Sequence, residues 1–334
     1  MVTLVVATAA DPASIGPASA FLAMPGWNPG PSIAIGMESF ANGSVRLLKH
    51  ERSIVAEDDL DRRWEAATEE PVDEVIFLSR HTAVSNRPAL TVHPIGVPHI
   101  REGEPLPQGG RPCWAGPPNP RVGPWLRLMK KIAEANGLIP EFEITLEATH
   151  HGPVVNTPTM FLEIGILLWK DLVLEEGAGT YGGSIRYTSK NYVYDNIDYT
   201  LWGQNIEKGL ARTKISHIKN NGDKVLLGIG GGHYVPRHMD IVWKDGVWVG
   251  HLLSGYSLPM EDPNQKKGEN GEKCIGGAWK QAIKVSYEAT KLAFPGGEVI
   301  AHLDHKSFKG WQKNAITSFL TEENIKIGKP QDFY

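Results

Sequence analysis

Histidines and carboxylates gather at several places along this chain of 334 residues, each next to a segment expected to be a strand. Glu147, His150 and His151 form one group, and His233 follows a run of three glycines. Asp304 and His305 form another group. Imidazole is the side chain best suited to proton transfer near neutral pH. Imidazoles and carboxylates without thiolates also fit a catalytic zinc site that has an open position. The residue types therefore point to hydrolysis by an activated water.

The segments that precede these residues have the pattern of short buried strands. Strands are expected at 2–8, 72–79, 89–93, 142–148, 160–164, 225–229 and 298–303, and helices at 123–137, 280–294 and 311–322. An Asp245-Gly246 pair between β-rich flanks predicts a hairpin turn. Strands that alternate with helices over one core indicate an α/β fold, in which ligands bind beyond the carboxyl ends of the strands. We therefore expect the polar groups to converge at one such edge.

Composition sets the limits on other classes of protein. The net charge is −4, which excludes a chain-wide basic coat for nucleic acid but leaves room for local basic clusters at 121–131 and 306–329. Two distant cysteines, Cys113 and Cys274, exclude a disulfide framework and a thiolate zinc site. The first residues lack the features of a signal peptide, and no run of about 20 apolar residues occurs. These features favour a protein with no membrane association, located in the cytoplasm, with the nucleus as a second location.

One domain over 1–334 is expected, because neither a repeat nor a linker interrupts the chain. The stretch from about 166 to 223 stands apart, since it is rich in Gly, Asn, Tyr, Lys and Ser and has no sustained periodicity. Such composition predicts a divergent, poorly ordered and exposed segment.

Several long motifs resemble those of one family. They are Ser79-Arg-His-Thr-Ala-Val-Ser-Asn-Arg-Pro88, Glu147-Ala-Thr-His-His-Gly-Pro153, Gly228-Ile-Gly-Gly-Gly-His-Tyr234 and Ala301-His-Leu-Asp-His-Lys306. In this order they closely resemble the D-aminoacyl-tRNA deacylases of the archaeal and plant type, and in particular the plant branch. The resemblance implies hydrolysis of the ester that joins a D-amino acid to tRNA, with D-aminoacyl-tRNA as partner and no obligate protein partner. It also implies zinc as a cofactor, and a phosphorylase-like or peptidyl-tRNA hydrolase-like fold, in which a mixed central sheet has helices on both faces.

The residues are assigned roles from their places beyond the predicted strands and from this resemblance. Catalytic roles are predicted for His150, His151, His233 and His305; substrate contacts for His81, Asn86, Arg87, Gly230, Gly231, Gly232 and Lys306; and metal ligation for Glu147, His151, His233 and Asp304. The glycine run could present backbone N–H groups to an oxyanion or a phosphate. Two other functions remain open on the sequence. One is a metal-dependent, carboxypeptidase-like or nucleoside-processing hydrolase, and the other is a tRNA-binding protein without catalysis.

Overall fold

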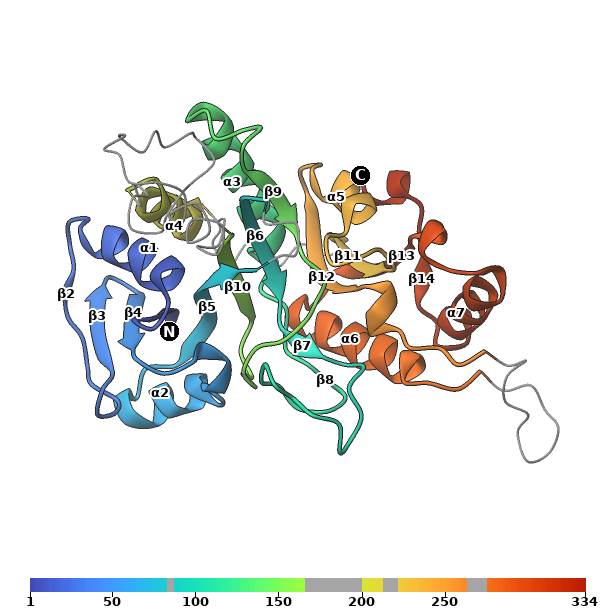
Figure 1. Ribbon diagram of the computed structural model, residues 1–334, viewed down its shortest axis with the longest axis horizontal. Coiled ribbons are helices and arrows are strands. Elements are labelled where there is room, and N and C mark those ends of the chain that lie inside the picture. The colour runs from blue at the N-terminus through green and yellow to red at the C-terminus, as the bar shows by residue number, and fades with distance from the viewer. Residues whose placement is uncertain (83–86, 166–199, 213–221, 263–274) are drawn as a thin grey trace, which may run out of the picture.

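Two sheets built from separate parts of the chain lie side by side in the computed structural model (Figure 1). The structure describes residues 1–82, 87–165, 200–212, 222–262 and 275–334. The larger sheet has eight strands in the order β2 (Asn28–Pro29), β3 (Glu38–Asn42), β4 (Val45–His50), β1 (Val2–Thr8), β5 (Val72–His81), β10 (Thr159–Gly165), β6 (Ala89–Pro94) and β9 (Glu143–Leu146). Strands β4, β1, β5 and β10 run parallel, whereas β6 pairs antiparallel with β10, so the sheet is mixed.

The smaller sheet is entirely parallel and has the order β12 (Val247–Leu253), β11 (Lys224–Ile229), β13 (Glu298–Leu303) and β14 (Lys326–Ile327). A short antiparallel pair, β7 (Gly96–Val97) and β8 (Trp114–Ala115), lies apart from both. The Asp245-Gly246 pair is not a hairpin turn. It connects helix α5 (Pro236–Val242) to β12, and β12 pairs parallel with β11.

Helices cover both faces of the larger sheet, and its central strands β1 and β10 are accordingly buried at every residue. Val5 and Ile76 belong to the core under α1 (Pro12–Leu22) and α3 (Val122–Ala135). Their neighbours Val6 and Phe77 face the opposite way, into a core that includes Leu60 and Trp64 of α2 (Leu60–Thr68). In the smaller sheet, α6 (Trp279–Ala293) and α7 (Gly310–Glu322) pack with Leu227 and Ala301. The predicted mixed α/β architecture with helices on both faces is confirmed, but the strands are shared between two sheets.

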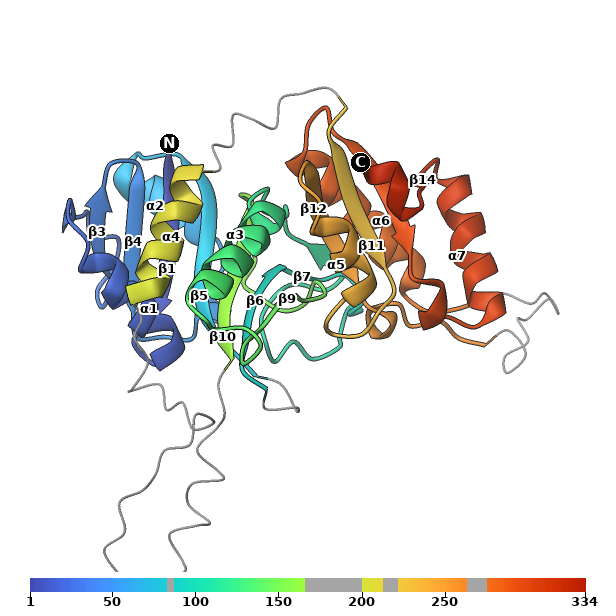
Figure 2. The same cartoon turned by 90° about the horizontal axis from the view of Figure 1, so that it is seen from above.

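Part of the segment expected to be exposed forms a packed helix. Helix α4 (Thr200–Arg212) lies against α1 and α3 (Figure 2). A Cβ on Gly203 would approach the backbone of Ala20 to 2.9 Å, and one on Gly209 would approach the Trp125 ring to 2.8 Å. These glycines therefore permit close contact between the helices, and the expectation of poor packing is wrong for 200–212. The rest of 166–223, except the short stretch from 222, lies outside the described residues.

No helix in the described ranges is both long and apolar enough to cross a membrane.

Two fully buried histidines away from the candidate site make the fold sensitive to acid. His238 Nε2–H donates to Gly230 O at 3.1 Å, and His251 Nε2–H donates to Gly116 O at 2.8 Å. Burial lowers the pKa of each ring to about 4. Between about pH 6.5 and pH 4 these two histidines are therefore protonated in the unfolded chain but not in the folded chain.

We expect the free energy of unfolding to fall as the pH is lowered from about 6.5 to about 4, by up to about 1.4 kcal/mol per pH unit for each of the two histidines. Urea unfolding at several pH values measures this slope. His251→Gln keeps an N–H that can donate to Gly116 O but cannot be protonated, and should reduce the slope. An unchanged slope in this variant would show that His251 does not cause the acid sensitivity.

Candidate active site

The strand register of the larger sheet places acidic and imidazole side chains on one face. Phe161 of β10 pairs with Phe77 of β5 on one side and with His93 of β6 on the other. Glu163 lies two residues further along β10, so its side chain projects from the same face as His93. Because β6 and β9 run opposite to β5 and β10, the groups do not meet above a common carboxyl edge of the strands. They converge on a face of the sheet, which corrects the expectation from strand order.

Glu147, just after β9, is the central carboxylate of this site and is fully buried. Its Oε2 lies 2.7 Å from Nε2 of His233 and 3.5 Å from Nε2 of His150. Its Oε1 lies 2.9 Å from Nδ1 of His81. Three imidazoles from three different parts of the chain therefore share one carboxylate.

Glu163 supplies a second buried carboxylate a short distance away. Its oxygens lie 3.5 Å from Nδ1 of His81, 3.7 Å from Nε2 of His93 and 4.0 Å from Nε2 of His151. The seven side chains are called here the histidine–glutamate cluster: His81, His93, Glu147, His150, His151, Glu163 and His233.

The two carboxylates and burial together determine which imidazoles are charged. Burial by itself would lower the pKa of His81, but hydrogen bonds to Glu147 and Glu163 outweigh it and raise that pKa to about 9. Burial would likewise raise the pKa of Glu147, yet His233 and His81 hold it well below its usual value. In contrast, burial and the charge of His93 lower the pKa of His151 to about 4 and that of His150 well below its usual value. At neutral pH, His81 is a cation, Glu147 is an anion, and His150 and His151 are neutral.

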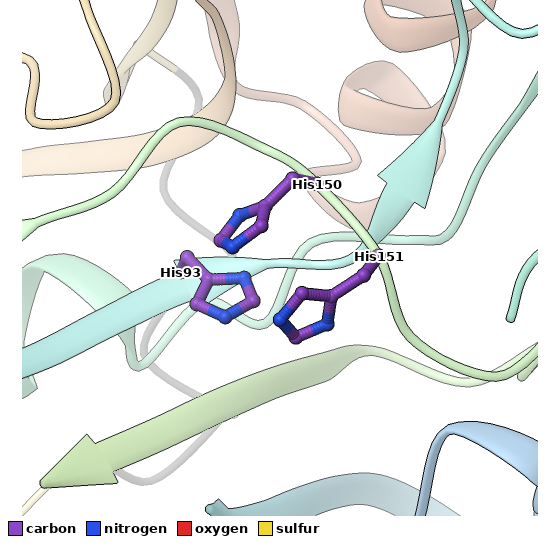
Figure 3. A group of neighbouring side chains, drawn as sticks. All are labelled: His93, His150 and His151. Carbon is purple, nitrogen blue, oxygen red and sulfur yellow. The ribbon is translucent and has the colours of Figure 1, made fainter. Parts of the chain in front are cut away.

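The adjacent rings of His150 and His151 both enter the cluster, although successive side chains of a regular strand point to opposite faces. The backbone of His151 has a φ of 25°, and Gly152 follows at 111°, so the chain turns sharply here. The two ring centroids lie 4.2 Å apart, and those of His93 and His150 also lie 4.2 Å apart. The three rings point toward one another from β6 and from the loop after β9 (Figure 3).

The glycine loop after β11 carries His233 to Glu147. Gly230 has a φ of 100°, and a Cβ there would approach the Phe308 ring to 2.8 Å, so glycine is required. Ala148 N donates to His233 O at 2.8 Å, which fixes the loop of the smaller sheet against the end of β9. The site is thus built across the junction of the two sheets.

Other residues with predicted roles lie around this cluster in different settings. Asp304 accepts hydrogen bonds from Lys306 N and Ser307 Oγ, and pairs with Arg237 Nε at 3.1 Å. Asp304 belongs to none of the candidate metal groups found among the described residues. His305 and Lys306 are exposed on the turn after β13. Arg87, also exposed, pairs with Glu143 at 3.6 Å, and Asn86 lies outside the described residues.

Four members of the site were not assigned a role from sequence. His93 and Glu163 lie within buried strands, and in the sequence each belongs to a mostly apolar run that predicts a strand rather than a site. Tyr234 places its hydroxyl 2.7 Å from Nε2 of His81, and Tyr256 places its hydroxyl 3.3 Å from Nδ1 of His233. The signal available for Glu163 was an acidic residue in the middle of an otherwise apolar strand, because such a residue needs a partner when buried.

Three groups in the cluster have the spacing of metal ligands: His93, His150 and His151; His81, Glu147 and His233; and His93, Glu147 and Glu163. Within each group one ligand atom per residue lies within 4.8 Å of the others. The first group also has suitable tautomers. Nδ1 of His93 and Nδ1 of His150 each donate to a backbone carbonyl, of Pro94 at 3.0 Å and Ala148 at 2.7 Å, so in both rings Nε2 is the atom that can bind a metal. Neutral His150 has a free lone pair there. Burial would lower the pKa of His93, but the Glu163 carboxylate raises it, so Nε2 of His93 must lose its proton when a metal binds.

The fold and the site together define an α/β protein with a buried histidine–glutamate centre suited to acid–base chemistry or to metal binding. Comparison with known proteins identifies the family. The family model described as D-aminoacyl-tRNA deacylase matches residues 68–171 and 198–328. The chain belongs to the D-aminoacyl-tRNA deacylase family.

Individual relatives agree with this assignment. A D-aminoacyl-tRNA deacylase of Arabidopsis thaliana is 61% identical over 343 aligned residues, which cover 100% of both chains. One of Methanosarcina barkeri is 26% identical and covers 87% of this chain and 76% of the relative. A solved structure described as a conserved protein of unknown function, AF0625, shares the fold with a TM-score of 0.68 and 19% identity, over 99% of this chain and 96% of that one.

Proposed function

We propose that this protein hydrolyses the ester bond of D-aminoacyl-tRNA and releases free tRNA and a D-amino acid. Family membership supports the substrate class. The observation that carries the chemistry is the contact at 2.7 Å between Glu147, which is fully buried, and the His233 ring, whose side chain is 37% exposed. A buried carboxylate that binds one nitrogen of an accessible imidazole is the arrangement of an oriented general base.

In this proposal His233 removes the proton from the attacking water. Its Nε2–H donates to Glu147, which leaves Nδ1 as the basic atom. Nδ1 lies 3.3 Å from the Tyr256 hydroxyl, on the exposed side of the ring. The carboxylate fixes the tautomer and stabilises the imidazolium that forms when the proton is transferred. The proton then passes to the leaving ribose oxygen.

Tyr234 is placed to stabilise the oxyanion of the tetrahedral intermediate. Cationic His81 donates its Nε2–H to the Tyr234 oxygen at 2.7 Å, so the phenolic proton is free for another acceptor. Burial raises the pKa of Tyr234 to about 12, so the phenol keeps its proton at neutral pH. A polarised O–H donor aimed at developing negative charge is an effective stabiliser in a site from which water is excluded.

A comparison of substrates tests the reaction class. The purified chain is incubated separately with D-Tyr-tRNA, with a peptide that carries a carboxyl-terminal D-tyrosine, and with adenosine. We expect release of tyrosine from the charged tRNA only. Cleavage of the peptide or the nucleoside in its place would favour the rival hydrolases, and tRNA binding without release would favour a binding protein.

We further propose that His93, His150 and His151 hold a zinc ion. Nε2 of His93 and Nδ1 of His151 are buried and make no hydrogen bond to any described residue. The neutral state of His150 and His151 is the state that ligates a metal. Three imidazoles, two of them with an N–H anchored on a backbone carbonyl, fit zinc well. Zinc bound there would supply a water of lowered pKa next to the ester.

Zinc content provides a readout that is independent of activity. We expect about one zinc per chain in the purified protein, measured by atomic emission after dialysis, and at least a ~10-fold lower content in His150→Ala. His305→Ala, which removes an exposed imidazole, should keep its zinc. A variant at His150 that retains full zinc content, or a wild-type protein without zinc, would contradict the proposed ligand set.

Because the net charge is −4, tRNA must bind to a locally basic surface. Helix α3 lies at the junction between the two sheets (Figure 2) and carries Lys130 and the exposed Lys131. Lys130 Nζ lies 3.8 Å from Glu134 and 4.7 Å from the centre of the Trp243 ring, so this end of the helix combines a cation with an aromatic surface.

Changing both Lys130 and Lys131 to glutamate should weaken tRNA binding. It should also reduce the slope of log Kd against the logarithm of the salt concentration by the amount that corresponds to about one to two lost phosphate contacts. Filter binding over a range of salt concentrations measures this change. Lys291→Glu on α6 is the matched control and should bind as the wild type does. If the double variant binds tRNA at low salt as tightly as the wild type does, the tRNA-binding surface does not include this part of α3.

A further inference from the structure

Three glycines precede His233, and contacts from outside the loop hold them in place. Glycine has more backbone freedom than any other residue, so a run of glycines fixes the side chain that follows it only if other groups restrain the run. Gly230 N donates to Leu253 O of β12 at 2.7 Å, and Gly230 O accepts from Nε2–H of the buried His238 at 3.1 Å. Both polar groups of the first glycine are therefore bound by the smaller sheet and by helix α5.

A serine on the turn after β13 holds the second glycine. Gly231 N donates to Ser307 Oγ at 2.7 Å, and Ser307 Oγ–H donates to Oδ2 of Asp304 at 2.9 Å. Asp304 is buried, and its Oδ1 lies 3.1 Å from Nε of Arg237 on α5. The Ser307 hydroxyl thus has an acceptor for its proton and a donor for its oxygen, and these two partners fix its orientation.

This arrangement involves residues that the mechanism above leaves unused. Asp304 belongs to the motif at 301–306, and Ser307 directly follows that motif. Because β11 and β13 are adjacent and parallel, the turn after β13 lies beside the glycine loop. The N–H groups of the first two glycines are engaged within the protein, which indicates that the run supports His233.

We propose that Ser307 is a positioning residue for His233, a proposal that rests on the function proposed above. Ser307 holds the loop at Gly231, two residues before His233, and Ala148 N holds it from the other side by donating to His233 O at 2.8 Å. With both points fixed, the ring stays on Glu147 at 2.7 Å. Loss of the hydroxyl lets the glycines move, and a displacement of about 1 Å is enough to slow a reaction by up to about 10²-fold.

The kinetic test compares two serines with the same pair of hydrogen bonds. Ser307→Ala should lower kcat for D-Tyr-tRNA by about 10-fold and change KM by less than about 2-fold, whereas Ser307→Thr keeps a hydroxyl for Gly231 N and should restore most of kcat. The matched control is Ser14→Ala in the larger sheet. Ser14 Oγ accepts from Thr8 N at 2.9 Å and donates to Leu78 O, and its loss should leave kcat unchanged.

A second background shows whether Ser307 acts through His233. In a protein that already carries His233→Ala, Ser307→Ala should lower the remaining single-turnover rate by less than about 2-fold, because the base that it positions is absent. A general loss of folded protein would lower the rate by the same factor in both backgrounds. Equal factors in the two backgrounds would therefore contradict the proposal.

Hydrogen exchange of residues 230–233, followed by mass spectrometry, tests the anchor without substrate. We expect exchange about 10-fold faster in Ser307→Ala, and exchange like that of the wild type in Ser307→Thr and Ser14→Ala. Unchanged exchange in Ser307→Ala would overturn the anchor, whether or not the protein is active. Faster exchange with full kcat, in a wild type that releases D-tyrosine, would overturn the positioning role alone. A wild type that releases no D-tyrosine would instead contradict the proposed function.

Discussion

Replacement of Glu147 by glutamine is expected to lower kcat for D-Tyr-tRNA by about 10³-fold, within the range found when acid–base or electrostatic groups are lost from an active site. The change keeps the shape of the side chain but removes the charge that holds three imidazoles. His233 then loses the carboxylate that fixes its tautomer. His81 loses the shorter of its two ion-pair contacts, so its pKa should fall from about 9.

Two further measurements make this prediction specific to the site. NMR titration of His81 reports the fall in its pKa without reference to activity. Glu143→Gln, on the same strand β9 and half-buried, is the matched control and should change kcat by less than about 3-fold. A folded Glu147→Gln protein with nearly full activity would show that this carboxylate does not support the catalytic base.

Alanine at His233 should lower kcat by at least about 10²-fold, the usual effect of losing a general base. His233 is the half-exposed imidazole of the cluster, with one nitrogen on Glu147 and the other toward Tyr256. Single-turnover deacylation of D-Tyr-tRNA isolates the chemical step from product release. Because His233 lies on a surface loop rather than in a core, this variant should retain the fold.

Alanine at His305 provides a comparison, because catalytic roles were predicted from sequence for both His233 and His305. His305 is exposed on the turn after β13. If it contacts tRNA, His305→Ala should raise KM rather than lower the single-turnover rate. A large loss of the single-turnover rate in His305→Ala, together with a small loss in His233→Ala, would reverse the roles proposed for these two residues.

The central strands of both sheets and helices α3, α6 and α7 could be predicted from sequence because each is a continuous apolar or amphipathic run, whereas the short helices α2 and α5 were not predicted. Strand pairing could not be predicted, since it depends on contacts between distant segments. The antiparallel direction of β6 relative to β10 moves the site from a common strand edge onto a face of the sheet. Helix α4 was missed because its composition is polar and rich in glycine, whereas Gly203 and Gly209 are the residues that let it pack closely.

The same limits apply to the site. Glu147 and His233 could be identified because they border strands and loops, where polar residues suggest function. His93 and Glu163 could not, because a strand pattern does not show which buried residue has a partner across the sheet. The positive φ of His151, which brings its ring beside that of His150, also has no signature in the sequence.

The central claim is that the histidine–glutamate cluster removes D-amino acids from tRNA, and the enantiomers of one amino acid on one tRNA test it most directly. The purified protein is mixed with D-Tyr-tRNA and with L-Tyr-tRNA, and the release of tyrosine is followed under single-turnover conditions. We expect release from the D-form at least about 10²-fold faster than from the L-form, and loss of this release in Glu147→Gln. Equal rates for the two enantiomers, or D-specific release that survives in folded Glu147→Gln, would contradict the account.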